Sequence, residues 1–224
     1  MPAFADTRWS QVRRLGTDSP SGRAALGWLA EAAWDPLCRH AQRRGLDRPS
    51  AEDAVQSFLA RVLERGLGRP DPARGRFRTW LLAAFWHHLA DLADQARTLK
   101  RGGGRTAATL SGIDASAEAT DAEFDRDWAR TVLARVLAAL AAEQQDASRF
   151  ALLRPFLAGN PDPEAYAVAA RRLELNPGAL RVAVHRLRQR FGELLRAEVA
   201  ETIDDADVLD DELKLLAAAL AEQR

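Results

Sequence analysis

The chain has 224 residues, of which 47% are hydrophobic and 29% charged, a composition typical of a folded globular protein. It has no apolar run near the roughly 20 residues that a membrane-spanning helix needs. Its single cysteine, Cys38, excludes an internal disulfide framework and a multi-cysteine metal site. The first 20 residues lack the apolar stretch of a secretory signal, so a reducing cytoplasm is the expected setting.

The formal net charge of zero is divided among four blocks of alternating sign. Residues 1–105 carry 18 basic and 11 acidic side chains, and residues 166–196 carry 7 and 2. Residues 106–165 carry 5 basic and 10 acidic side chains, and residues 197–224 carry 2 and 9. Ordinary surface variation produces some unevenness, but the two basic blocks coincide with helical segments. This favours two surfaces that face nucleic acid.

Helical periodicity recurs along the first half of the chain, and no stretch alternates as a β-strand does. After an N-terminal arm (1–20), the apolar spacing predicts three helices, over 26–41, 50–64 and 77–99. Pro36 lies inside the first, where a kink or a break is expected. Ser50 is expected to cap the second, with Asp53 completing a capping box. These helices predict a first domain over 21–101.

Three consecutive glycines, Gly102–Gly104, begin an acidic and weakly patterned stretch. Three glycines in a row cost too much backbone entropy to lie inside a helix, which predicts a flexible linker over 102–125. Beyond it, apolar spacing predicts a second helical domain over 126–200 and an acidic tail, 201–224, with a last helix. The predicted fold class is therefore all-α: two small helical domains joined by a flexible linker, plus a C-terminal helical tail.

Two sequence signals divide the end of the second domain into two helices. Asp162-Pro163 and Asn176-Pro177 each place an N-cap residue before a first-turn proline, with a short turn at Leu173–Leu175 between the helices. Two helices joined by a short turn, the second one basic, are typical of a helix-turn-helix. The exposed face of the second helix is expected to carry Arg181, His185, Arg186, Arg188 and Arg190.

The N-terminal part of such a helix can enter the major groove, where an arginine reads guanine through two hydrogen bonds. Flanking arginines would hold phosphates and set the register. The simpler alternative is a solvated amphipathic helix, but no acidic residue falls between Asn176 and Gly192. We therefore expect this helix to contact duplex DNA.

The same helix carries a resemblance to a known family. Its sequence NPGALRVAVHRLRQRFGELL (Asn176–Leu195) resembles the second half of region 4.2 in extracytoplasmic-function (ECF) sigma factors. SAEDAVQSFLARVLE (Ser50–Glu64) is similar to region 2.2, and RGRFRTWLLAAFWHHLADLA (Arg74–Ala93) to regions 2.3 and 2.4. TRWSQV (Thr7–Val12) is similar to the opening of a planctomycete-type subgroup. The resemblance covers nearly the whole chain, with three motifs in order.

What the resemblance implies is a polymerase specificity subunit rather than an enzyme, with no catalytic residue, cofactor or metal. Such a subunit binds the clamp helices and the flap of core RNA polymerase and directs initiation at promoter DNA. The helix from Asn176 would read the −35 element. Contacts with the melted −10 element would come from Arg69, Arg74, Arg76, Arg78 and Trp80. The polymerase would be bound by Glu52, Asp53, Gln56 and Arg61.

Elementary chemistry agrees with part of this assignment. Arginines can hold single-strand phosphates and aromatic rings can accept unstacked bases, although the apolar spacing places Phe77 in the core. For the polymerase-binding set, an ordinary exposed polar face fits equally well. Two departures from the family pattern matter: Val182-Ala183 replaces a common Ser-Arg, and the basic run over 91–105 is thin. Backbone binding by this run should therefore be weak and salt-sensitive.

Other functions stay open beside the sigma factor. One is a helix-turn-helix regulator that binds duplex DNA without polymerase, and another is a helical protein-interaction scaffold. An enzyme is not expected, because the four histidines are scattered and no H-E-x-x-H motif, phosphate loop or nucleophile elbow is present. The tail, 201–224, is expected to compete with DNA for arginines of a sigma-like module or to bind a regulator; a solvated tail with one packed helix is the alternative. Whether an anti-sigma or other regulatory protein binds the chain stays open.

Overall fold

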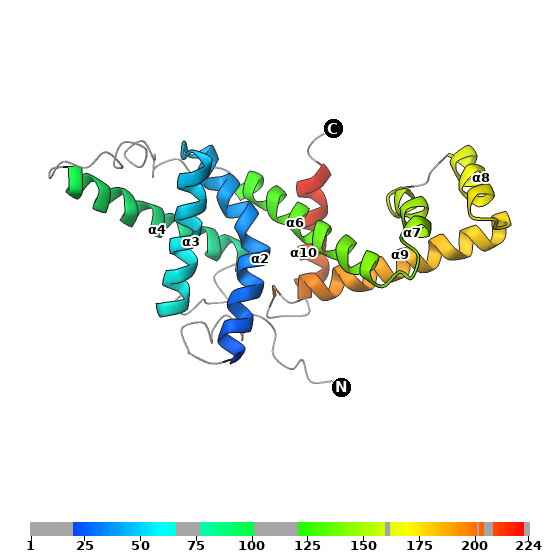
Figure 1. Ribbon diagram of the computed structural model, residues 1–224, viewed down its shortest axis with the longest axis horizontal. Helices are drawn as coiled ribbons and strands as arrows, with labels where there is room; N and C mark the ends of the chain where they lie inside the picture. Colours follow the sequence, from blue (N-terminus) through cyan, green and yellow to red (C-terminus); the bar gives the residue numbers. More distant parts are fainter. Residues whose placement is uncertain are drawn as a thin grey trace. The chain divides into compact units, whose positions relative to one another are not determined.

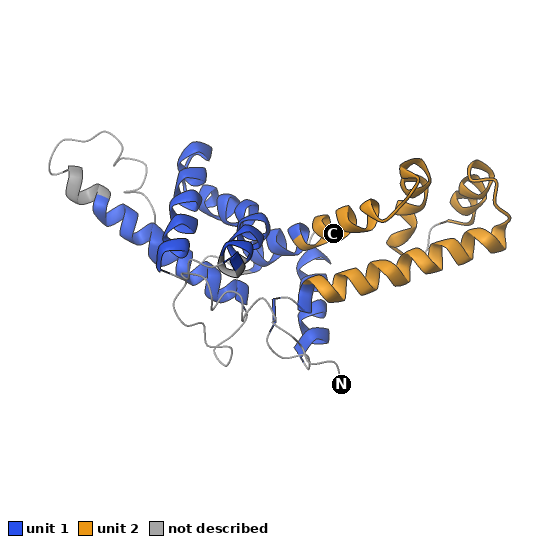
Figure 2. Ribbon diagram, turned by 60° about the horizontal axis from the view of Figure 1, so that its bottom comes forward, with its two compact units in different colours: residues 1–131, 199–224 blue, residues 132–198 orange. Residues whose placement is uncertain are grey.

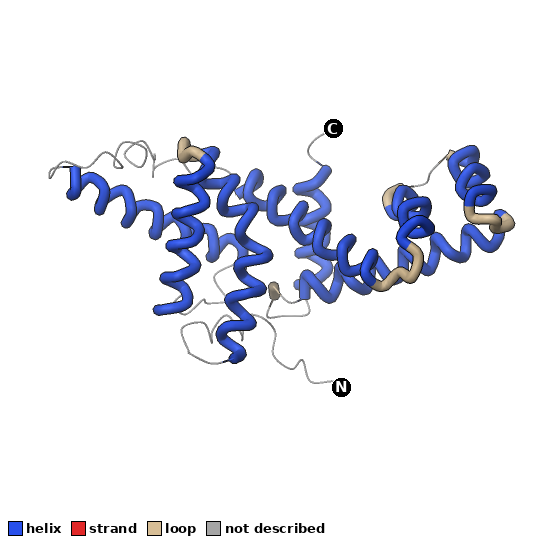
Figure 3. The backbone as a smooth tube through the Cα atoms, in the orientation of Figure 1, coloured by secondary structure: helices blue, strands red, loops and turns tan. Residues whose placement is uncertain are grey.

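The computed structural model describes residues 20–65, 77–100, 121–159, 162–200, 202–203 and 208–221. Within these ranges it contains eight α-helices and one 3₁₀ turn, and no strand (Figures 1 and 3). The expected all-α fold class is confirmed. None of the described helices has the combined length and apolar character needed to cross a membrane. The expected N-terminal arm up to residue 19 and the expected linker up to residue 120 lie outside the described residues.

Short turns connect most neighbouring elements within the described ranges. They are α2 (Pro20–Arg43), α3 (Arg48–Arg65), α4 (Phe77–Lys100), α6 (Asp121–Ala142), α7 (Ala147–Leu153), η2 (Arg154–Leu157), α8 (Pro163–Arg172), α9 (Pro177–Ala200) and α10 (Leu209–Ala221).

The chain divides into two compact units (Figure 2). Unit 1 comprises residues 1–131 and 199–224, and unit 2 comprises residues 132–198. The division differs from the expected domains in two respects. The boundaries between the units fall inside α6 and inside α9. In addition, α6 begins at Asp121, so the last part of the expected linker is helical. The tail helix α10 also belongs to unit 1 rather than forming a separate segment.

The core of unit 1 is built from apolar faces at helical spacing, as the sequence predicts. Phe58 of α3 meets Phe85 of α4 edge-on, with ring centroids 5.3 Å apart. Phe77, at the start of α4, lies 5.9 Å from Trp28 of α2 and 6.1 Å from Trp128 of α6. These aromatic contacts hold four helices of unit 1 together, and the placement of Phe77 in the core is confirmed by its 2% exposure.

The structure narrows one local prediction for unit 1 and corrects another. Of the outcomes expected at Pro36, a break does not occur: α2 continues from Pro20 to Arg43, because fully buried Ala33 and Leu37 pack the helix on both sides of the proline. The cap of α3 is Asp47 rather than Ser50, since Asp47 Oδ1 accepts the backbone N–H of Ser50 at 2.9 Å. A carboxylate is a strong cap, and the neighbouring proline tolerates the first turn, where its missing N–H needs no partner.

Unit 2 has its own apolar core, assembled from four helices and the 3₁₀ turn. Leu140 of α6 and Leu180 of α9 are fully buried in it. They pack with Phe150, Leu153, Phe156, Ala169, Ala170, Val184 and Leu187. This cluster packs α8 and α9 against one core, and α9 carries the residues predicted to contact DNA.

Candidate nucleic-acid interface

The turn between α8 and α9 is built entirely from local interactions. The N–H of Leu175 donates to the carbonyl of Ala170 at 2.9 Å, and that of Glu174 to the carbonyl of Arg171 at 3.2 Å. This pair of bonds is a Schellman motif, which places Glu174 in the left-handed region at φ 53°. Leu175 packs against the core cluster of unit 2, so the turn is fixed by both backbone and side chain.

The start of α9 is capped as the sequence predicts. Asn176 Oδ1 accepts the N–H of Ala179 at 2.8 Å, and Pro177 occupies the first helical position. The same arrangement begins α8, where Asp162 accepts the N–H of Glu164 at 3.3 Å. Two capped helices separated by the residues 173–176 therefore form a helix-turn-helix in geometry as well as in sequence.

The buried face of α9 determines which basic side chains are presented. Leu180, Val184 and Leu187 point into the unit 2 core. Arg181, His185 and Arg186 lie on other faces and are exposed. Val182, the residue at which the sequence departs from the family pattern, is 50% exposed beside them.

Two arginines of the predicted DNA-contacting set are engaged within unit 2. Arg188 is half-buried and donates from Nε to the carbonyl of Phe156 at 2.8 Å and from Nη2 to the carbonyl of Gly159. Arg190 binds Glu143 through two hydrogen bonds of 2.6 and 2.8 Å, and Glu193 at 2.7 Å. These bonds raise the pKa of Arg190. Arg190 stays exposed, so of these two arginines Arg188 is the one that is not fully exposed as predicted.

Two further basic residues adjoin the turn. Arg171 and Arg172 end α8, and both are exposed. They are not among the residues predicted from the sequence to contact DNA. Basic residues in the last turn of the first helix are nevertheless a usable signal, because this end of α8 leads directly into the turn before α9.

The predicted −10 contacts have different outcomes. Arg69, Arg74 and Arg76 lie outside the described residues. Trp80 is half-buried, with its ring 6.1 Å from that of Phe77. Arg78 is only 3% exposed and its guanidinium is bound by Asp125 and Glu212. In this conformation Arg78 is not exposed for a phosphate contact, and carboxylates from two other helices compensate its charge.

The predicted polymerase-binding residues all lie on α3. Asp53 and Gln56 are exposed. Glu52 is half-buried and accepts a hydrogen bond from Arg48 at 2.8 Å. Arg61 is exposed and donates to Asp91 of α4 at 2.5 Å.

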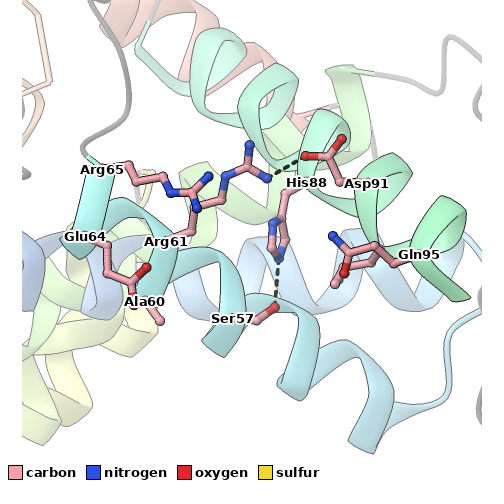
Figure 4. A pocket seen from close by; sticks show the side chains of 9 residues that line it. Ser57, Ala60, Arg61, Glu64, Arg65, His88, Asp91 and Gln95 are labelled. Atoms are coloured by element: carbon pink, nitrogen blue, oxygen red, sulfur yellow. Dashed lines mark hydrogen bonds and ion pairs between the residues drawn. The ribbon is translucent and has the colours of Figure 1, made fainter.

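A polar pocket of about 290 Å³ lies between α3 and α4 (Figure 4). Ser57 Oγ and His88 Nε2 are 2.8 Å apart at its wall, and Asp91 points across it to Arg61. Ser57 donates to the Ala54 carbonyl, so His88 Nε2 is the donor in the Ser57 pair. His88 Nδ1 is buried without a hydrogen-bond partner among the described residues. Serine, histidine and aspartate thus meet here, but without the carboxylate–imidazole bond of a hydrolytic triad.

His40, His88 and Cys38 of unit 1 are buried, packed groups. Burial is the main cause that lowers the pKa of both His88 and His40. Burial also raises the pKa of the Cys38 thiol to about 11. Over the part of the chain that the structure describes, no group of three or more histidine, cysteine or carboxylate residues is placed to hold a metal ion.

Unit 2 also has an apolar groove of about 610 Å³. Its lining comes from α6, α7, η2 and α9 and comprises Leu133, Leu137, Ala151, Arg154, Pro155, Leu157, Ala158 and Phe191. Its volume is within the range of about 300–1,000 Å³ that is usual for ligand pockets, which are lined mostly by apolar side chains.

The chain matches no protein-family model, no curated protein and no solved structure. The interpretation of these surfaces therefore rests on their geometry and on the motifs in the sequence.

Proposed function

We propose that this chain is an alternative sigma factor of the ECF type, which binds core RNA polymerase and directs initiation at −35 and −10 promoter elements. The observation that carries the proposal is the α8–turn–α9 arrangement, in which a capped helix presents Arg181, His185 and Arg186 beside a Schellman turn. The order of the sigma-like motifs along the chain then assigns this helix to the −35 element.

The chemistry of the α9 surface suits duplex DNA. The N-terminal turn of a helix has backbone N–H groups without helical partners, and these attract phosphate oxygens. Arg181 lies one turn into the helix, where an arginine can reach the edge of a guanine. Arg171 and Arg172 on α8 and Arg186 on α9 supply further positive charge for phosphates.

Surfaces on both units support a protein partner as large as core polymerase. On unit 1, the exposed Asp53 and Gln56 lie on α3, which also lines the polar pocket. We assign this face to the clamp helices. On unit 2, we assign the apolar groove around Leu137 and Phe191 to the flap.

The test is run-off transcription with purified chain and core polymerase on a pool of templates with randomised −35 and −10 positions. The proposal expects discrete RNA starts downstream of an enriched pair of elements. Arg181→Ala combined with Arg186→Ala should lose the −35 preference, whereas Arg149→Ala, which removes an exposed arginine of α7, should keep it. Duplex binding without any polymerase-dependent start would identify a free-standing regulator. Binding of neither DNA nor polymerase would leave a scaffold.

A further inference from the structure

Arg78 is buried at the start of α4 by residues from two other helices of unit 1. Its Nε and Nη2 atoms donate to Asp125 of α6, and its Nη1 atom donates to Glu212 of α10. Arg78 is 3% exposed and Glu212 is 5% exposed. The carboxylate of Glu212 is separated from Arg78 by 134 positions in the chain. The C-terminal helix therefore covers a residue that the resemblance to sigma factors assigns to a nucleic-acid surface.

α10 is held on unit 1 along its length. Glu212 binds Arg78 in the first turn, and Leu216 is buried one turn later with 6% exposure. Near the C-terminal end, Arg126 Nε donates to the carbonyl of Ala219 at 3.2 Å, which satisfies a carbonyl that the helix itself leaves open. The acidic first turn of α10 also suits the positive end of its helix dipole.

Two carboxylates surround one guanidinium at this site, so negatively charged groups outnumber the positive one. Asp125 accepts hydrogen bonds from Nε and Nη2 of Arg78, and Glu212 accepts one from Nη1. If α10 leaves, Arg78 keeps Asp125 as a partner but has an open donor at Nη1. Guanidinium groups bind phosphate oxygens through the same charge-assisted bonds that they make to carboxylates. Glu212 and a phosphate are therefore chemically equivalent occupants of this donor.

We propose that the surface around Arg78 at the start of α4 binds the backbone of single-stranded nucleic acid, and that α10 is its built-in competitor. Glu212 occupies the Arg78 donor that a phosphate takes when α10 is displaced. The inference rests on the proposed function, because Arg78 belongs to the segment assigned to the melted −10 element. It adds the regulation of that site: α10 and the single strand bind unit 1 in mutually exclusive states, so the apparent affinity equals the intrinsic affinity multiplied by the fraction of molecules in which α10 is undocked.

The test compares two charge reversals on neighbouring positions of α10. Glu212→Lys places an ammonium beside Arg78 and should displace the helix. Asp211→Lys makes the same change of charge at an exposed residue that pairs with Lys214 at 2.8 Å, and it should leave the helix docked. Glu212→Ala is the milder second variant, since it leaves Arg78 compensated by Asp125. Binding of a 20-nucleotide single-stranded DNA is followed by fluorescence anisotropy at low salt, and amide hydrogen exchange follows α10.

The expected result is faster exchange over α10 in Glu212→Lys and Glu212→Ala but not in Asp211→Lys. The affinity for single-stranded DNA should rise at least about tenfold for both Glu212 variants relative to Asp211→Lys. Adding Arg78→Gln should abolish this gain. Equal affinities for Glu212→Lys and Asp211→Lys would mean that only net charge matters and would overturn the inference. Faster exchange of α10 with no gain in affinity, or a gain that survives Arg78→Gln, would overturn it as well.

The same variants separate this inference from the proposed function. One outcome is that the Asp211→Lys variant initiates transcription with core polymerase, but Glu212→Lys shows no gain in affinity for single-stranded DNA. This outcome would contradict the inference and leave the sigma-factor proposal standing. Absence of transcription by every variant would remove the sigma-factor proposal. In that case the anisotropy comparison would still decide whether α10 competes with nucleic acid for Arg78.

Discussion

At the scale of single residues, His40 shows how burial sets the charge of a side chain. It lies on α2, edge-on to Trp86 and Phe124 at centroid distances of 5.4 and 6.0 Å. Burial, and then the nearby Arg44 and Arg43, lower its pKa to about 4, while Asp127 acts in the opposite direction. The ring is therefore neutral in the folded protein at pH 7.

The buried His40 predicts a loss of stability in acid. Its folded pKa lies below the unfolded value of 6.5, so between these values the unfolded chain binds the extra proton. The contribution of His40 is complete above pH 6.5 and is lost as the pH falls toward 4, by roughly 3 kcal/mol at most. Denaturant unfolding at pH 7, 5.5 and 4.5 should show a shallower pH dependence for His40→Phe than for the wild type. The exposed His87→Phe should follow the wild type, and parallel curves for all three would contradict the assignment.

Glu174 has a backbone conformation that is unfavourable for its residue type. It takes φ 53° at the end of α8, a region in which side chains other than glycine and asparagine are strained. Glu174→Gly should therefore raise the free energy of unfolding of unit 2 by up to about 1 kcal/mol, because it relieves roughly 1–2 kcal/mol of left-handed strain and loses part of that gain to the larger backbone entropy of glycine. Asparagine should give a smaller gain and alanine none. Hydrogen exchange of the α9 amides measures this order, and a destabilising glycine would show that the Glu174 side chain has a role of its own.

At the scale of elements, α9 contains two kinds of arginine. Arg188 donates to two backbone carbonyls, whereas Arg186 is exposed on the outer face. Arg188→Ala should cost about 1–3 kcal/mol of unit 2 stability, because it removes the donor for both carbonyls. Arg186→Ala should leave the unfolding curve unchanged and weaken duplex binding, with the slope of log affinity against log salt reduced by about one. A stable Arg188→Ala that loses DNA binding in the manner of Arg186→Ala would reverse these roles.

How far the sequence predicts each element depends on how local its determinants are. The stripe through Leu180 and Val184 and the Asn176 cap lie within a few residues of one another, and both are confirmed. The fates of Arg78 and Arg188 depend on partners 134 and 32 positions away, which no periodicity contains. The cap of α3 is an intermediate case: Asp47 and Ser50 are both good capping residues, and the position of Pro49 in the first turn decides between them.

At the scale of the whole molecule, unit 1 is made from two chain segments that flank unit 2. Its C-terminal segment ends in α10, which an acidic composition alone does not distinguish from a solvated tail. The buried Glu212 and Leu216 make α10 part of the unit 1 fold. The aromatic residues allow the two units to be followed separately, since all six tryptophans lie within residues 1–131 and the single tyrosine, Tyr166, lies in unit 2.

A matched pair of leucines tests whether α10 stabilises unit 1. Leu216 is 6% exposed and Leu215 is 37% exposed on the same helix. Leu216→Ala should lower the free energy of unfolding followed by tryptophan fluorescence by about 2–3 kcal/mol, because it leaves a cavity under α10. Leu215→Ala has the same change in size and helix propensity and should have little effect. Exchange protection of the α8 amides and of the α9 amides up to Glu198 should be the same in both variants, since these residues lie in unit 2. Equal unfolding curves for the two variants would mean that α10 contributes nothing to unit 1 and that displacing it from Arg78 is free of cost. In that event the docked helix would be too sparsely populated to compete with a single strand. A competitor can exclude a ligand only to the extent that its own docking is favourable. A lower free energy of unfolding for Leu216→Ala than for Leu215→Ala would therefore show that α10 docks favourably enough to compete in the Glu212 experiment.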